Sequence, residues 1–277
     1  MAKRSRTAQG VLAERALLTE MGVLSDPVAR TMVSPPWRAF MWFVQHWPSS
    51  QKPWSVARTG LAARTLWLDA QVRSALEAGI GQIAVVGAGY DSRAWRFADD
   101  GVQFYELDHG ETQGDKMRRA PVDGPEYVEA DLWTQGAAQA LLDHGLDGAQ
   151  PALFILEGLT MYLSEDIVQR HLSDLAGSSA SRSRISVDFY PPPDAGTSQD
   201  RRQMTCQRLA RTGSGEDLKL VVDLPRAAAI VEGSGWVVTE ATSLRDAARE
   251  LVGRESGLPV DAVNEHKSLI AGVRSDI

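Results

Sequence analysis

The sequence has little cysteine and no long apolar run. Its 277 residues include one cysteine, Cys206, which cannot form a disulfide within the chain. No stretch approaches the roughly 20 consecutive apolar residues that a transmembrane helix needs. The first residues are basic, as in a secretory signal peptide, but neither a continuous apolar segment nor a small-residue cleavage site follows them. We therefore expect a cytoplasmic protein in a reducing compartment, without a membrane partner.

A strong positive charge and metal-ligand spacing are also missing. The formal charge is −7 at pH 7, and the basic residues are scattered rather than gathered into a stripe, which disfavours binding to a phosphate backbone. We expect no nucleic-acid partner. The five histidines show no metal-binding spacing, and no cysteine/histidine cluster accompanies them, so we expect no metal site. The pattern G-x-S-x-G is absent, which argues against a serine hydrolase.

Residues 11–75 show mostly helical periodicity, in two amphipathic runs that a turn separates. An aromatic cluster lies between these runs and consists of Trp37, Phe40, Trp42, Phe43, Trp47 and Trp54. We consider two interpretations of this cluster, which are compatible with each other. It packs an N-terminal helical layer on the main core, or it forms a hydrophobic wall over a small-molecule pocket.

From residue 80 onward, short β-rich runs alternate with segments of helix length. The runs are QIAVVG, VQFYELD, EYVEAD, ALFILEG, RISVDFY, WVVTEAT and KSLIAGV. This alternation predicts an α/β fold with a doubly wound, mostly parallel seven-stranded sheet and helices on both faces. Such folds bind ligands outside the carboxyl ends of the strands, beside the first strand.

The same pattern suggests how the chain is organised, as a single domain over residues 1–277. Residues 1–60 form a helical and aromatic cap, residues 61–190 a ligand-binding core, and residues 223–277 the C-terminal part of the sheet. Residues 191–222 interrupt the alternation with a proline turn, a polar helix and a Gly-Ser loop. We interpret them as a cap insertion above the sheet.

The stretch IAVVGAGYDSRAWRF, residues 83–97, carries the first strand into a glycine turn. Gly87 and Gly89 allow the backbone to turn sharply and to approach a ligand closely. A dinucleotide fingerprint requires a third glycine where this chain has Ser92, so G-x-G-x-x-G is not satisfied. The glycine pair alone leaves a nicotinamide dinucleotide and a methyl donor both open.

Acidic residues follow the next three predicted strands. Glu106 and Asp108 lie about twenty residues beyond the glycines, where a carboxylate accepts hydrogen bonds from ribose hydroxyls. Asp131 could accept from an adenine amino group while Leu132 covers the ring, and Glu157 follows an apolar run into the predicted pocket. Several carboxylates around one site favour a ligand with donors and positive charge. S-adenosylmethionine fits this pattern better than pyrophosphate.

Five segments together resemble a known family. AARTLWLDAQVRSAL, VVGAGYDSRAWRF, YELDHGETQGDKMR, EADL and LFILEGLTMYLSEDIVQRHLSDLA occur in this order between residues 55 and 190. They are similar to the leucine carboxyl methyltransferase-like family of S-adenosylmethionine-dependent methyltransferases, above all to its bacterial branch, which includes polyketide carboxyl O-methyltransferases. The resemblance implies a Rossmann-like methyltransferase fold, S-adenosyl-L-methionine as cofactor and S-adenosyl-L-homocysteine as product.

The resemblance also implies roles for individual residues. Arg64 would bind the methionyl carboxylate, Asp108 the ribose, and Asp131 with Leu132 the adenine. The backbone of the glycine turn would contact the amino-acid part of the donor, and Glu157 would lie beside the methionine moiety. The turn residues implied are Gly87, Ala88 and Gly89.

The residues themselves leave alternatives open. A guanidinium suits a planar carboxylate because it binds it through two parallel hydrogen bonds, but Arg64 could also be an ordinary helix-surface residue. Asp108 and Glu157 could be helix caps or members of structural ion pairs. His109 could be a general base, although a positional role is the more plausible one. Gly110 stands where the bacterial branch commonly has proline.

We therefore expect an S-adenosylmethionine-dependent O-methyltransferase for a small molecule, acting on a carboxylate of a secondary metabolite or on a hydroxyl. A carboxylate acceptor needs no base at pH 7. Candidate acceptor-binding residues are Trp37, Trp42 and Tyr162. The alternatives are an NAD-dependent Rossmann oxidoreductase and a non-catalytic donor-binding subunit of a biosynthetic complex.

Overall fold

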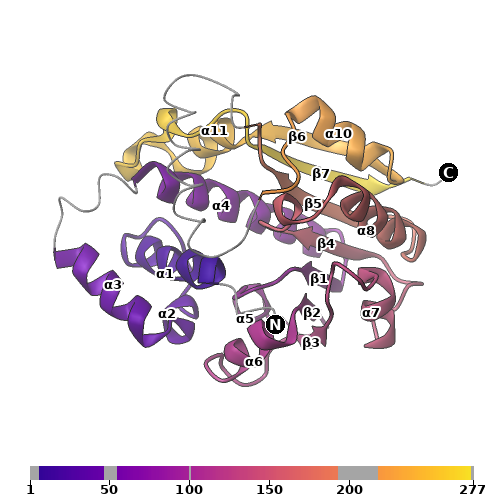
Figure 1. Ribbon diagram of the computed structural model, residues 1–277, viewed down its shortest axis with the longest axis horizontal. Helices are drawn as coiled ribbons and strands as arrows, with labels where there is room; N and C mark the ends of the chain where they lie inside the picture. Colours follow the sequence, from indigo (N-terminus) through magenta and orange to yellow (C-terminus); the bar gives the residue numbers. More distant parts are fainter. Residues whose placement is uncertain (1–5, 47–54, 100, 193–217, 276–277) are drawn as a thin grey trace.

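The computed structural model describes residues 6–46, 55–99, 101–192 and 218–275. Within them a single seven-stranded sheet has the order β3-β2-β1-β4-β5-β7-β6 (Figure 1). Its strands confirm all seven predicted β-runs and are β1 (Gln82–Val86), β2 (Gln103–Asp108), β3 (Glu126–Glu129), β4 (Ala152–Leu156), β5 (Arg184–Phe189), β6 (Trp236–Ser243) and β7 (Ser268–Arg274).

The first five strands are parallel, and β7 runs antiparallel to both β5 and β6. The chain leaves β1 toward β2 on one side, whereas β4 lies on the other side of β1. This reversal is the topological switch point at which doubly wound sheets bind ligands. Because β7 is antiparallel to β5, the first residues of β7 lie at the same edge as the carboxyl ends of β4 and β5.

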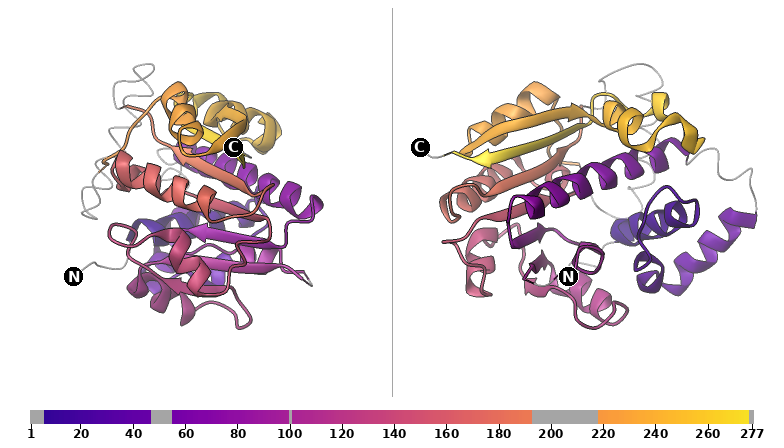
Figure 2. Two further views of the ribbon diagram at one scale, coloured as in Figure 1. Left: turned by 90° about the vertical axis from the view of Figure 1, so that its right-hand side faces the viewer. Right: turned by 180° about the vertical axis from the view of Figure 1, so that it is seen from behind.

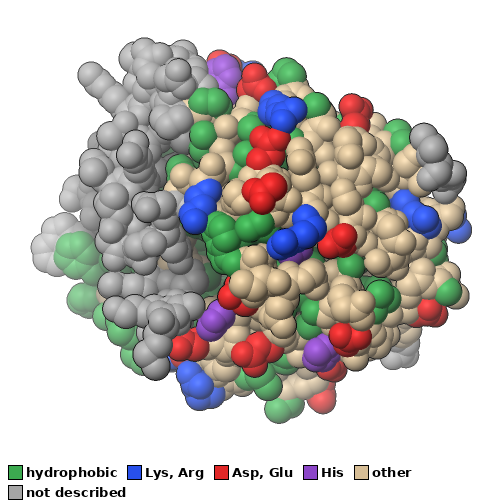
Figure 3. All heavy atoms as spheres, turned by 45° about the vertical axis from the view of Figure 1, so that its right-hand side comes forward, with side chains coloured by type: hydrophobic (Ala, Val, Ile, Leu, Met, Phe, Trp, Pro, Cys, Tyr) green, Lys and Arg blue, Asp and Glu red, His purple; other side chains and the backbone are tan. Residues whose placement is uncertain are grey.

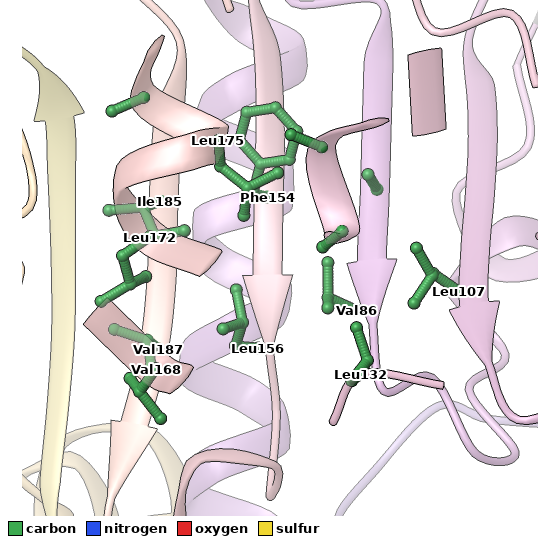
Figure 4. Packing of buried hydrophobic residues seen from close by; sticks show 14 of the residues in the cluster. Val86, Leu107, Leu132, Phe154, Leu156, Val168, Leu172, Leu175, Ile185 and Val187 are labelled. Atoms are coloured by element: carbon green, nitrogen blue, oxygen red, sulfur yellow. The ribbon is translucent and has the colours of Figure 1, made fainter. Parts of the chain in front are cut away.

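Helices cover both faces of the sheet. One face carries α7 (Ala137–Asp143), α8 (Glu165–Gly177) and α10 (Leu224–Glu232). Figure 4 shows leucine and valine side chains of α8 packed against Phe154 and Leu156 of β4 and Ile185 and Val187 of β5. All five residues of β4 are buried, as expected for a central strand between two helical layers.

The opposite face carries α4 (Ser55–Glu77), the longest helix described, together with α11 (Leu244–Ala247) and the short turns of η4 (Ala248–Val252) and η6 (Val260–Ala262). Figure 2 shows α4 running across the back of the sheet. Its residues Trp67, Leu68 and Val72 pack with Ile83 and Val85 of β1 in a second apolar core.

The N-terminal helices form a separate layer. These are α1 (Arg6–Glu20), α2 (Ala29–Met32) and α3 (Pro35–His46), which lie beside α4 and the short α5 (Arg93–Arg96) in Figures 1 and 2. Leu12, Met32 and Val33 pack with Tyr90, which follows the glycine turn. The N-terminal layer is therefore anchored directly beside the switch point.

Some predictions concern residues outside the described ranges. They include Cys206, Trp47, Trp54 and most of the predicted cap insertion, with its polar helix and its Gly-Ser loop. Residues 218–222, at the end of that insertion, are described and form a strap over the strand ends. The strap is held by the Lys219 N–H, which donates to the Met161 carbonyl, and by the Val222 N–H, which donates to the Tyr190 carbonyl.

The surface of the described residues is mixed in charge. On the face shown in Figure 3, acidic and basic side chains are interspersed with apolar and neutral ones. Among the helices of the described ranges, none combines the length and the apolar character needed to cross a bilayer.

Candidate active site

The predicted ligand-binding residues converge at the switch point. The glycine turn follows β1, Asp108 ends β2, Asp131 follows β3 and Glu157 follows β4. The parallel register of these strands brings their carboxyl ends to one edge of the sheet. Arg64 reaches the same edge from the middle of α4. The structure thus brings together residues that are up to 93 positions apart in the chain.

The glycine turn has the backbone that its sequence predicts. Gly87 and Gly89 have φ values of +73° and +54°, in the left-handed region that favours glycine. A Cβ atom at Gly87 would lie 2.9 Å from a methyl carbon of Leu159, and one at Gly89 would lie 3.2 Å from the Cβ atom of Ala8 in α1. The turn is therefore enclosed by the loop after β4 on one side and by the first turn of α1 on the other.

Asp108 orders the glycine turn through its carboxylate. Its two oxygens accept hydrogen bonds from the backbone N–H groups of Gly89 and His109, each at 2.6 Å. Burial raises the pKa of Asp108, although these two N–H groups oppose the rise. Each oxygen retains a second lone pair, so the carboxylate still accepts a hydroxyl donor, as a ribose-binding residue must.

His109 occupies a structural position. It is the N-cap of α6 (Gly110–Met117), and its Nδ1 accepts from the Glu111 N–H at 3.3 Å. A Cβ atom at Gly110 would meet only the carboxylate end of the exposed Glu129 side chain, which can move aside, so this contact does not explain the glycine. The geometry favours the positional interpretation of His109.

Arg64 is buried, so the helix-surface interpretation is wrong. Its Nε donates to Glu157 Oε1 at 2.9 Å and its Nη1 to Asp188 Oδ2 at 3.1 Å. Burial disfavours the charge of Arg64, but the two carboxylates outweigh it and raise its pKa. The hydrogen bonds of Arg64 to described residues use Nε and Nη1, which leaves Nη2 for a ligand carboxylate.

Glu157 joins two arginines. Arg93 is fully buried, and its Nη1 donates to Glu157 Oε2 at 2.8 Å. Burial opposes ionisation of Glu157, yet the charges of Arg93 and Arg64 dominate and hold its pKa well below its usual value. The ion-pair alternative for Glu157 is thus confirmed, and the pairing keeps a negative charge beside the glycine turn at neutral pH.

These contacts belong to a longer chain of buried ion pairs, which we call the ionic chain. It runs from Arg15 of α1 to Lys267, the residue before β7. Each cation in it contacts at least one carboxylate, and no side chain is more than 11% exposed. It comprises five cationic and five anionic residues, Arg15, Asp26, Arg96, Asp69, Arg93, Asp91, Glu157, Arg64, Asp188 and Lys267. The ionic chain is therefore balanced in charge without a ligand.

The loop after β3 is fixed from α8. Asp131 is exposed, and its Oδ1 accepts from the Trp133 N–H at 3.0 Å, whereas Leu132 is buried. His171 of α8 is fully buried, with Nε2 2.8 Å from the Leu132 carbonyl and Nδ1 3.4 Å from the Ala137 N–H. These partners require a neutral ring with its proton on Nε2. His171 therefore holds the loop that carries the two predicted adenine-binding residues.

The predicted acceptor-binding residues do not form one cluster. Trp37 packs in the N-terminal core with an edge-on contact to Phe40, at a centroid distance of 5.4 Å. Trp42 is 59% exposed and stacks on His46. Tyr162 is half-buried beside Met161 in a small cluster that also contains Tyr190, Leu218 and Val221. The last cluster lies at the strand ends, next to the ionic chain.

A model of the leucine carboxyl methyltransferase family matches residues 8–176. The chain belongs to the leucine carboxyl methyltransferase family. This family member is 30% identical over 226 residues to a Mycobacterium marinum protein, covering 76% of the chain and 74% of the relative. It is 30% identical over 252 residues to a Mycobacterium avium protein, covering 85% of the chain and 83% of that relative. Both names assign these relatives to the S-adenosyl-L-methionine-dependent methyltransferases and state no substrate.

Solved structures support the fold of this family member. A Thermobifida fusca YX protein named as a methyltransferase has a TM-score of 0.63 at 16% identity, over 98% of this chain and 96% of that chain. A DUF574 family protein from Streptomyces avermitilis MA-4680 has a TM-score of 0.62 at 14% identity, over 99% of this chain and 98% of that chain. The predicted Rossmann-like methyltransferase fold is confirmed. Family membership also decides against the NAD-dependent oxidoreductase that the glycine turn left open.

Sequence reasoning missed several residues of the site. Arg93 lies inside the quoted glycine-turn motif, but its burial is a tertiary property. Asp188 is the last but one residue of β5 and follows the same rule as the other acidic strand tips, so strand position could have identified it. No local signal marks Lys267, because the antiparallel return of β7 brings it to this edge.

Proposed function

We propose that this family member is an S-adenosyl-L-methionine-dependent O-methyltransferase that esterifies a carboxylate of a small molecule. The donor binds at the switch point, with its amino-acid carboxylate on Nη2 of Arg64, its ribose on Asp108 and its adenine at Asp131 and Leu132. Nη2 of Arg64 and the remaining lone pairs of Asp108 support this assignment. When bound, S-adenosyl-L-methionine supplies an electrophilic methyl group on a sulfonium sulfur.

The position of His109 is the observation that carries the acceptor class, because its ring caps α6 and its Nδ1 already accepts from the Glu111 N–H. The donor has an ammonium, a sulfonium and a carboxylate group, hence one net positive charge at neutral pH. The ionic chain is balanced, and Asp108 contributes a further carboxylate beside it, so the site itself compensates the charge of the donor. A carboxylate acceptor is already ionised at neutral pH and needs no base, whereas an alcohol has to lose a proton.

The residues around the donor then have two tasks. Arg64 and Asp108 orient the donor, and the enclosure of Gly87 and Gly89 by Leu159 and Ala8 excludes water. No proton has to be removed from a carboxylate at neutral pH, so His109 can remain a helix cap. The N-terminal layer and residues 191–222 are the parts that we assign to acceptor binding.

The test is a radiolabelled methyl-transfer assay with a panel of aliphatic and aryl carboxylic acids and their alcohol and phenol analogues. The expected product is a methyl ester, from which mild alkali releases methanol, and its rate of formation is nearly flat between about pH 6 and 8 because a free carboxyl group titrates near 4. His109→Ala should keep the activity. An alkali-stable labelled product whose formation requires His109 would show that the acceptor is a hydroxyl.

Absence of transfer to every member of the panel, with normal binding of S-adenosyl-L-homocysteine, would support the non-catalytic subunit instead. Thermal shift measurements detect that binding separately, because a ligand that binds only the folded state raises its melting temperature.

A further inference from the structure

We infer that Lys267 binds the carboxylate of the methyl acceptor and that Tyr190 and the strap hold its carbon skeleton. This inference rests on the proposed function and specifies the part of the site that recognises the substrate. It follows from the place of Lys267 at the end of the ionic chain, from its unused hydrogen-bonding capacity and from its apolar surroundings.

Lys267 lies at the strand edge because of the sheet topology. Ser268, the first residue of β7, pairs with Phe189, the last residue of β5. The backbone carbonyl of Lys267 accepts a hydrogen bond from the Leu244 N–H at 2.8 Å, which fixes the start of β7. Tyr190 directly follows β5, so the lysine and the tyrosine face each other at the carboxyl end of that strand.

The ammonium of Lys267 has one described carboxylate partner. Its Nζ lies 3.1 Å from Asp188 Oδ2, and the same oxygen accepts from Nη1 of Arg64 at 3.1 Å. The other oxygen of Asp188 accepts from the Gly158 N–H at 2.6 Å. One carboxylate thus serves two cations, and Lys267 is the cation that makes no second ion pair within the described ranges.

An ammonium has three N–H donors, of which Asp188 uses at most one. The Lys267 side chain is only 9% exposed, so water provides little compensation for the others. Its second contact is the ring of Tyr190, with Nζ 4.0 Å from the ring centroid. A cation over an aromatic face is stabilised there but still has its N–H donors available to an anion.

The cations next to Lys267 along the ionic chain are committed, and so is Lys116. Arg93 pairs with three carboxylates, and Arg64 pairs with two and is assigned to the donor. Lys116 is fully buried against Glu106 under α6, away from the strap. Lys267 is therefore the cation of this edge that is best able to accept a further carboxylate.

The surroundings of Lys267 define the rest of the acceptor. Tyr190 packs with Met161, and Leu218 and Val221 of the strap cover both. These side chains offer apolar and aromatic surface directly beside the ammonium. The ligand class that matches is a carboxylate on an apolar or aromatic skeleton, with its charge on Lys267 and its carbon chain under the strap.

The test measures binding of a carboxylate and its neutral isostere to the protein saturated with S-adenosyl-L-homocysteine. The probes are 3-phenylpropionate and 3-phenylpropanamide, titrated by calorimetry. The wild type should bind the carboxylate about tenfold more tightly than the amide, as one charge-assisted hydrogen bond predicts. In Lys267→Met this preference should disappear, while the affinity for S-adenosyl-L-homocysteine stays within about twofold of the wild type.

Two further variants make the result specific. Lys267→Gln also removes the charge but keeps N–H donors on a polar side chain, and it carries the test if the methionine variant does not fold. Arg119→Met is the matched control, because Arg119 is also a cation paired with a carboxylate, Asp115 at 3.2 Å, but belongs neither to the strap nor to the ionic chain. It should keep the preference for the carboxylate.

The outcomes separate the two hypotheses. A wild type that binds both probes equally would show that the carboxylate acceptor class, and with it this inference, is wrong. If the wild type prefers the carboxylate and Lys267→Met retains that preference, only the assignment of Lys267 is wrong. A loss of S-adenosyl-L-homocysteine affinity in Lys267→Met, restored by Lys267→Arg, would assign Lys267 to positioning Arg64 through Asp188, which also overturns an acceptor-binding role.

Discussion

The substitution Arg64→Lys tests the donor site most directly. Arg64 donates from Nε to Glu157 and from Nη1 to Asp188, in two different directions, and keeps Nη2 for the donor carboxylate. A lysine ammonium preserves the charge but is a single point at the end of a flexible chain, so it cannot satisfy all three directions at once. We expect it to stay with the two protein carboxylates and to lose the ligand.

The magnitude follows from the one interaction that is lost. A charge-assisted hydrogen bond contributes about 1.5–3 kcal/mol, so the Kd for S-adenosyl-L-homocysteine should rise roughly 10- to 150-fold. Isothermal titration calorimetry measures this change, and urea denaturation measures the accompanying loss of stability. The loss should be about 1–3 kcal/mol, because one buried carboxylate loses part of its hydrogen bonding.

Arg58→Lys provides the matched control for this experiment. Arg58 is also a buried arginine of α4, and its Nε donates to Glu14 of α1 at 2.6 Å. Its replacement should cost a comparable amount of stability without changing donor affinity. If Arg64→Lys binds S-adenosyl-L-homocysteine within about twofold of the wild type while remaining folded, Arg64 has only a structural role and the donor site is placed wrongly.

Three further substitutions test the surroundings of the site. Gly87→Ala should lower the free energy of unfolding by about 2–4 kcal/mol, because alanine is strained at positive φ and its Cβ would meet Leu159. Gly79→Ala is the control, since Gly79 has φ +77° but open space around it, and it should show only the smaller backbone cost. Equal losses of stability in urea denaturation would contradict the contact with Leu159. Lys116→Met should lower the free energy of unfolding by about 3–5 kcal/mol, because it leaves Glu106 buried and unpaired. The double variant Lys116→Met, Glu106→Leu should recover most of that loss. If the effects of the two single substitutions simply add, this reasoning is wrong. Burial lowers the pKa of His171, so the unfolded chain binds the proton more tightly and the free energy of unfolding falls as the pH drops below about 6.5. His171→Gln should flatten this pH dependence between about pH 5 and 7. An unchanged pH profile of the unfolding free energy would show that another group causes it.

Local sequence patterns identified the strands and the glycine turn. Alternating β-rich runs mark buried strands because a strand between two helical layers must be apolar on both faces, as β4 is. Gly87 and Gly89 were predictable because only glycine adopts positive φ at little cost, and the structure has positive φ at both. Asp108 was predictable because the carboxyl end of a parallel strand faces the ligand edge.

The sequence by itself could not tell a surface arginine from a buried one. Arg64 sits in a helix whose periodicity is consistent with either face, and its burial depends on how α4 packs across the sheet. The role of His171 was equally hidden, because its partners belong to a loop 34 and 39 positions away in the chain. Pairing of this kind requires the tertiary arrangement.

The sequence alone determined the fold class, the order of the strands along the chain and the acidic strand tips, because these depend on local periodicity and on which residues end each strand. The tertiary structure decided which charges meet. The ionic chain joins α1 to the residue before β7, and Arg64 and Lys267 share Asp188 only because β7 returns antiparallel to β5. Coulomb attraction and desolvation depend on distance and burial rather than on separation in sequence, so the electrostatics of the site appear only when the chain has folded.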